Sequence, residues 1–146
     1  MALVVGTNSW VTLVEADAYL TNKVGTQDWF SLTDTPTNPG DASKESFLIT
    51  AFNYLITKAG YVIPSDSTDA NVQAAQTEFA YYLFVYGAAY EDRINAQASG
   101  VTEFKLSKWS EKYSESSLLD QPLPSIVQNY LSEYYYLNIT ASITVE

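Results

Sequence analysis

Residues 70–98 constrain the fold more than any other part of the sequence, because they form its longest stretch with helical periodicity. The stretch contains no proline, and Asp69 precedes it as a candidate N-cap residue. One face repeats at helical spacing and consists of Val72, Ala75, Gln76, Phe79, Leu83, Tyr86 and Tyr90. The apolar surface extends almost around the helix through Tyr82, Val85 and Ala89. This pattern predicts a helix that is central in its domain or shared with a neighbouring subunit.

A shorter helix is predicted near the N-terminus, over about residues 13–24. Thr12 and Glu15 have the spacing of a capping box, in which each side chain accepts a hydrogen bond from the other residue's backbone N–H. Gly25 is expected to end this helix. Its inward face is expected to include Leu13, Ala16, Leu20 and Val24.

Two more helices complete the expected set. One spans about residues 42–59, is capped by Asp41 or Ser43 and ends at Gly60. The other spans about residues 125–137. The inward face predicted for this last helix consists of Ile126, Val127, Tyr130, Leu131 and Tyr134.

Two segments have the period-two alternation of strands. Residues 101–109 are predicted to form a strand or extended arm, and residues 138–146 a C-terminal strand-like tail. An unpaired strand exposes an edge, so the tail is predicted to pair with residues 101–109 of the same chain or of a neighbour; a frayed tail is the alternative. The expected fold is mainly α. It is a small bundle of about four helices in one domain, residues 1–137, with an arm at about 99–122.

Composition argues against an enzyme. The 146 residues include no cysteine and no histidine, which excludes disulfides, thiol nucleophiles, histidine bases and nearly all zinc sites. No spacing of carboxylates resembles a calcium loop, so no catalytic residue, cofactor or metal is expected. No apolar run approaches the roughly 18 residues that a membrane helix needs, and no signal peptide is expected, so we expect synthesis in the cytoplasm.

The charge is unfavourable for binding nucleic acid. The net charge is −10, and the seven bases are scattered along the chain. Nucleic-acid binding draws much of its affinity from Lys and Arg side chains that displace counterions from phosphates. An acidic surface instead repels DNA.

Tyrosine is unusually frequent, with twelve copies. These rings could stack on the bases of a single strand, but such platforms work beside a basic groove. Alternatively they line the edge of the core and subunit contacts, where a ring with a polar tip is favoured. We favour the second interpretation, in which the candidate subunit or partner contacts are Tyr82, Tyr86, Tyr90, Phe104, Trp109, Ile139 and Ile143.

Several segments of the sequence resemble those of one family of tailed-phage proteins. The opening residues 2–9 and 15–19 (ALVVGTNS and EADAY) are the most similar, followed by residues 72–80 (VQAAQTEFA). Residues 123–127 (LPSIV) are similar to the start of the family's last helix. The family is that of the neck, or head–tail adaptor, proteins, which are often labelled DnaT-like single-stranded DNA-binding proteins. Two departures are the absence of a proline at Ala70–Asn71 and the extra residues 139–145.

The resemblance implies a structural role in the virion. It implies a ring, usually of twelve copies, that docks below the portal protein and links the capsid to the tail or to a stopper or terminator protein. DNA would pass through the lumen without specific binding, and the protein would be located in the neck. It implies no catalytic motif and no membrane contact. The alternative is the single-stranded DNA-binding role that the family's label suggests.

Overall fold

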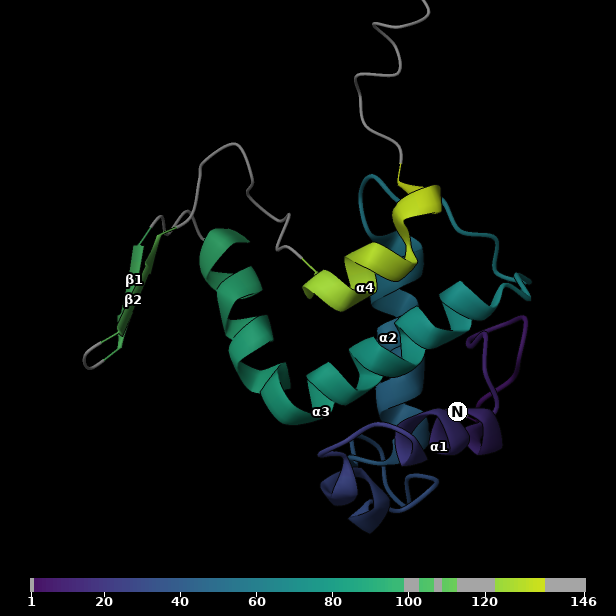
Figure 1. Ribbon diagram of the computed structural model, residues 1–146. Helices are drawn as coiled ribbons and strands as arrows, with labels where there is room; N and C mark the ends of the chain where they lie inside the picture. Colours follow the sequence, from purple (N-terminus) through teal and green to yellow (C-terminus); the bar gives the residue numbers. More distant parts are fainter. Residues whose placement is uncertain (1, 99–102, 107–108, 113–122, 136–146) are drawn as a thin grey trace, which may run out of the picture.

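The computed structural model describes residues 2–98, 103–106, 109–112 and 123–135. It is mainly helical, as the sequence predicts (Figure 1). The helical elements are α1 (Leu13–Thr21), the 3-10 helix η1 (Gln27–Ser31), α2 (Lys44–Thr57), α3 (Ala70–Ala98), α4 (Ser125–Tyr130) and the 3-10 helix η3 (Ser132–Tyr134). The strands are β1 (Glu103–Leu106) and β2 (Trp109–Lys112).

The first half of α3 is the centre of the molecule. Every residue from position 74 to position 80 is buried, including the polar Gln76, Thr77 and Glu78. α2 and α4 pack against α3, and α1 contacts it as well (Figure 1). Burial of all sides of its first half confirms the expectation, drawn from the helix's apolar circumference, that α3 is central in its domain.

The predicted helix starts are confirmed. At α1, the Glu15 backbone N–H donates to the Thr12 hydroxyl oxygen over 3.1 Å, and the Thr12 N–H donates to the Glu15 carboxylate over 2.9 Å. Ser43 caps α2 with Ser46. The Asp69 carboxylate accepts from the Asn71 N–H over 2.8 Å at the start of α3. Each side chain thus satisfies a backbone N–H that has no partner within the helix.

Two helix ends differ from the prediction. α1 ends at Thr21, and Val24 is 97% exposed rather than inward. The reason is local: the Thr26 hydroxyl donates to the carbonyl oxygen of Leu20 over 2.6 Å, so the chain turns back before Gly25. A side chain that donates a hydrogen bond to a carbonyl in the last turn competes with the backbone N–H that would continue the helix.

The last helix is also shorter than predicted. α4 ends at Tyr130 and is followed by the single turn of η3, where the Tyr134 N–H donates to Leu131 O over 2.9 Å. Val127 and Leu131 are buried as expected, but Ile126 is exposed. The tighter turn lets the Tyr134 carbonyl accept from the Val62 N–H over 3.0 Å. This long-range bond fixes the end of the described chain.

α3 bends sharply between its two halves (Figure 1). The ring centroids of Phe79 and Tyr90 lie 5.6 Å apart. A straight helix rises about 1.5 Å per residue, which would separate these positions by roughly 16 Å. Gly87 lies within the bend, where the missing side chain makes a change of direction less costly.

Residues 103–112 include two strands where the sequence analysis expects one extended segment. β1 and β2 pair antiparallel, with Leu106 opposite Trp109 and Glu103 opposite Lys112. In Figure 1 this hairpin lies apart from the helical body, beyond the end of α3. The predicted tail over residues 138–146 lies outside the described residues.

Replacing Gly60 with alanine is expected to destabilise the fold more than the same change at Gly25. Both residues have a positive φ, +89° and +87°, which costs about 1 kcal/mol for alanine. At Gly60 a Cβ would also lie 2.7 Å from the Tyr135 ring, which packs at a tilt against Tyr61, whereas at Gly25 the space is open. Urea unfolding of both variants measures the difference. In a Tyr135→Ala background the two costs should become equal, and a persistent difference would contradict the role of Tyr135.

Candidate interaction site

A surface groove lies between α2, the bend of α3 and the loop over residues 36–42. Its volume is about 980 Å³. The floor is aromatic: the Phe47 and Phe84 rings lie 5.6 Å apart, edge to face, and Trp29 lies behind Phe84 at 6.1 Å. Val85 stands in the groove with 46% of its surface exposed. We call this hollow the α2–α3 groove.

Hydrogen bonds hold the loop that forms one wall of this groove. The Asp41 carboxylate accepts from the Thr37 hydroxyl and from the Asn38 N–H, each over 2.8 Å. These donors hold the pKa of Asp41 below its usual value. The segment just before the loop is held to the start of α2, because the Lys44 N–H donates to Thr33 O over 2.9 Å. The wall is therefore ordered without a ligand.

The bend of α3 divides the three predicted contact tyrosines of that helix. Tyr90 is buried against Phe79, Tyr82 and Tyr54, with ring centroids 5.6–6.0 Å away. Tyr82 is half-buried, and Tyr86 is 56% exposed instead of facing the core. Tyr86 is thus accessible to a partner, Tyr82 partly so, and Tyr90 belongs to the protein's own core.

The other predicted contact residues lie elsewhere or outside the described residues. Phe104 is in β1, opposite Glu111, and Trp109 is in β2. The structure does not bring them together with the α3 tyrosines, because β1 and β2 lie beyond the end of α3 (Figure 1). Ile139 and Ile143 lie outside the described residues.

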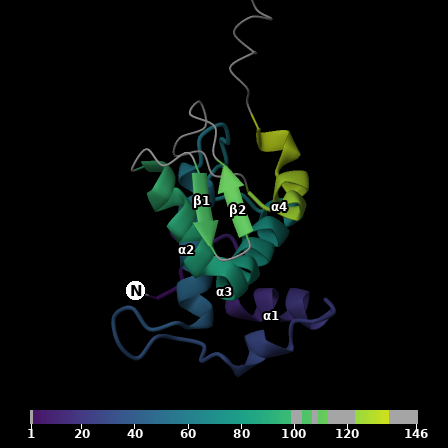
Figure 2. The ribbon, with the colours of Figure 1, turned by 90° about the vertical axis from the view of Figure 1, so that its left-hand side faces the viewer.

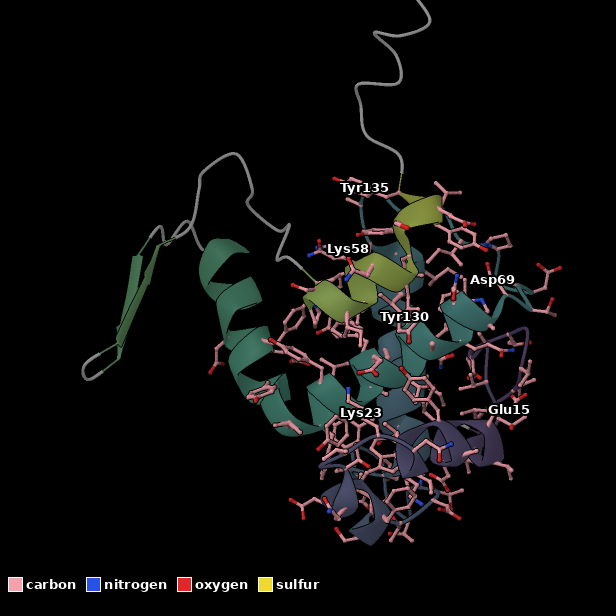
Figure 3. All side chains as sticks on the ribbon, in the orientation of Figure 1. Glu15, Lys23, Lys58, Asp69, Tyr130 and Tyr135 are labelled. Carbon is pink, nitrogen blue, oxygen red and sulfur yellow. The ribbon has the colours of Figure 1, made fainter. Side chains whose placement is uncertain are left out.

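A chain of polar groups links α1, α3 and α4. The buried Glu78 carboxylate forms an ion pair with Lys23 and accepts a hydrogen bond of 2.6 Å from the Tyr19 hydroxyl. The Tyr130 hydroxyl lies 3.3 Å from that of Tyr19. Figure 3 shows Tyr130 on α4 and Lys23 on the same side of the molecule, next to α3. Because each oxygen of this buried carboxylate has a partner, the cluster serves to hold three helices together.

The Tyr19 cluster predicts a loss of stability in alkali. Burial and the Glu78 carboxylate raise the pKa of Tyr19 far above its usual value near 10. A raised pKa in the folded state gives stability that is complete below pH 10 and is lost as the pH rises further, since the unfolded chain deprotonates first. Tyr19→Phe should therefore show a shallower fall of unfolding free energy between pH 10 and 11, measured by urea titration. Tyr86→Phe, at an exposed ring, is the control, and equal slopes in the two variants would contradict the prediction.

Neither the groove nor the Glu78 cluster is among the features predicted from the sequence. Glu78 is the single charged residue between positions 70 and 90, so its place among apolar residues was an available signal for a buried, paired carboxylate. The sequence indicated the groove only weakly, through the prolines at positions 36 and 39, which mark the loop that forms one of its walls. Its floor joins residues from three segments, which periodicity alone does not bring together.

Few bases are available on the described surface. Lys23 pairs with Glu78, and the largely buried Lys44 lies 3.2 Å from Asp17 and 3.3 Å from Asp34. Among the residues that the structure describes, no group of three or more acidic side chains could hold a metal ion. None of the described helices has the length and apolar character needed to cross a membrane. The α2–α3 groove is therefore the candidate interaction site on the described surface.

Comparisons with known proteins identified no relative of this chain. A scan against protein-family models, a search of curated proteins and a search of solved structures each found no match to this chain.

Proposed function

We propose that this protein is a structural assembly protein of a tailed phage, the head–tail adaptor of the neck. In this role it forms a ring, of twelve copies by the resemblance of residues 2–19 and 72–80 to that family, below the portal protein. The ring joins the capsid to the tail or to a stopper or terminator protein.

The observation that carries the proposal is the accessible apolar surface of the described residues. The α2–α3 groove exposes Val85 next to an aromatic floor, and Tyr86 lies exposed on the same bend of α3. Exposed apolar patches on a small domain are typical of surfaces that bind another protein. A subunit of a ring needs two such surfaces, one for each neighbour.

The acidity of the chain supports the same role. A ring with a net charge of −10 per subunit repels phosphate, which allows DNA to slide through a lumen without adhering to it. Strong acidity is of no use to a protein that must hold DNA.

Electron microscopy and mass photometry of the purified protein, alone and with the portal protein, test the proposal. The expected result is a closed ring, formed either by the protein alone or on the portal. A protein that stays monomeric and never joins a portal would contradict it.

Single-stranded DNA is expected to bind weakly. The net charge is −10, and two of the seven bases, Lys23 and Lys44, are already in ion pairs within the subunit. Because affinity depends on bases that displace counterions, we expect a Kd above about 10 μM near 150 mM salt. Fluorescence anisotropy with a labelled oligonucleotide measures it, with the same titration at 20 mM salt as the control. Sub-micromolar binding at 150 mM salt would favour the alternative, DNA-binding role.

A further inference from the structure

The α2–α3 groove has an apolar floor and an acidic rim. Asp41 stands on the loop side and Glu91 on the side of α3. The Glu91 carboxylate accepts a 3.2 Å hydrogen bond from the Tyr54 hydroxyl, which leaves its second oxygen available. The described residues that line the groove include no lysine or arginine. A suitable occupant therefore combines apolar side chains with positive charge.

The β1–β2 hairpin has this composition. Three of the seven bases in the sequence, Lys105, Lys108 and Lys112, occur there within eight positions. Residues 103–112 contain these three lysines, the apolar Phe104, Leu106 and Trp109, and two acids, Glu103 and Glu111, so the hairpin has a net charge of +1. These are the most closely spaced bases of an otherwise acidic chain, and they stand among apolar residues.

Within the part of the chain that the structure describes, the hairpin is a sheet of two strands. β1 and β2 pair with each other, and the described elements include no further strand beside either of them. Figure 2, turned by 90° from Figure 1, shows both strands standing in front of the helices. An isolated two-stranded hairpin is at best marginally stable in water and gains stability when another surface covers it.

We propose that the β1–β2 hairpin of one copy binds in the α2–α3 groove of the next copy. The proposal rests on the proposed function and names the two surfaces that would join the subunits. A hairpin-to-groove contact is heterologous, because each subunit donates one surface and accepts with another. Repetition of such a contact closes into a ring when the rotation allows it.

Charge complementarity favours a second copy as the occupant. Two chains of net charge −10 repel each other over most of their surfaces. Docking the lysines of residues 105–112 between Asp41 and Glu91 places opposite charges together at the one apolar contact. This arrangement fixes both the partner and its orientation.

Cysteine cross-linking tests the contact directly, because the natural chain has no cysteine. A Val85→Cys protein is mixed with a Lys108→Cys protein, and disulfide-linked heterodimers are followed on oxidation. We expect them to form at least tenfold faster than in a mixture of Val14→Cys with Lys108→Cys. Val14 is the control because it is 78% exposed and does not line the groove.

A second set of variants tests the role of charge at one position. Val85→Lys and Val85→Glu have similar bulk and opposite charge, and we expect Val85→Lys to associate at least tenfold more weakly in mass photometry. The double change Lys105→Glu with Lys108→Glu should also prevent association. Mixing this hairpin variant with Val85→Lys should restore association beyond dimers, because the now acidic hairpin of one variant meets the added lysine in the groove of the other.

The outcomes separate the inference from the proposed function. The hairpin contact would be overturned if cross-links formed at equal rates in the test and control mixtures, or if the two Val85 variants associated equally well. The same results are expected if a segment of the portal or tail protein fills the groove instead. If rings nevertheless form, the adaptor role stands and another surface joins the subunits. If the specific cross-link forms and no ring appears with or without the portal, the contact stands and the adaptor role fails.

Discussion

Replacing Gln76 with leucine is expected to lower the free energy of unfolding by about 2–4 kcal/mol. The Gln76 side chain is fully buried and joins three segments. Its amide oxygen accepts from the Trp10 N–H over 2.8 Å, and its amide nitrogen donates to the Ser9 hydroxyl and to Leu48 O, each over 2.9 Å. Leucine has a similar volume, so the main cost is a buried backbone N–H at Trp10 that loses its partner.

Gln73 on the same helix provides the matched control. Its amide donates a single bond of 3.2 Å, to Trp10 O, and its side chain is half-buried. Gln73→Leu should therefore cost no more than about 1 kcal/mol. Urea unfolding monitored by tryptophan fluorescence and circular dichroism measures both. Equal costs for the two variants would mean that the N-terminal segment is not anchored through Gln76.

The sequence predicted the elements of the fold because their determinants are local. The capping box at Thr12 and Glu15 and the cap at Asp69 depend on residues within three positions of each other, and both are present. The end of α1 was not predictable in the same way. It depends on the Thr26 hydroxyl reaching Leu20 O, a contact that a helical pattern extended to Val24 does not reveal.

The burial of α3 was predictable as a whole but not residue by residue. A face drawn on a straight helix places Tyr86 and Tyr90 side by side, but the bend buries Tyr90 and exposes Tyr86. The direction of the bend depends on aromatic packing with Tyr54 of α2. The groove depends on the same bend, so it appears only in three dimensions.

Replacing Lys23 with methionine is expected to lower the free energy of unfolding by about 2 kcal/mol. The Glu78 side chain is only 3% exposed, so its carboxylate would remain buried without a cation. Removing one partner of a buried ion pair costs about 3–5 kcal/mol, and the expected cost is smaller here because the Lys23 side chain is 35% exposed. Methionine keeps the apolar stem of lysine, so the change isolates the charge.

A double-mutant cycle with Glu78→Gln shows whether the loss comes from this pair. Glutamine keeps an oxygen that can accept from the Tyr19 hydroxyl, and Glu78→Gln alone leaves Lys23 partly in solvent, so we expect it to cost about 1 kcal/mol. The variant with both changes should lose about 1–2 kcal/mol instead of the roughly 3 kcal/mol that simple addition gives, which corresponds to a coupling energy of about 1–2 kcal/mol. Because Glu78 is shielded from solvent, 1 M salt should change this coupling little, whereas it would abolish the coupling of a surface pair. If the two changes are simply additive, the charge of Lys23 does not act through Glu78, and the link between α1 and α3 rests on the hydrogen bond from Tyr19 to Glu78 alone.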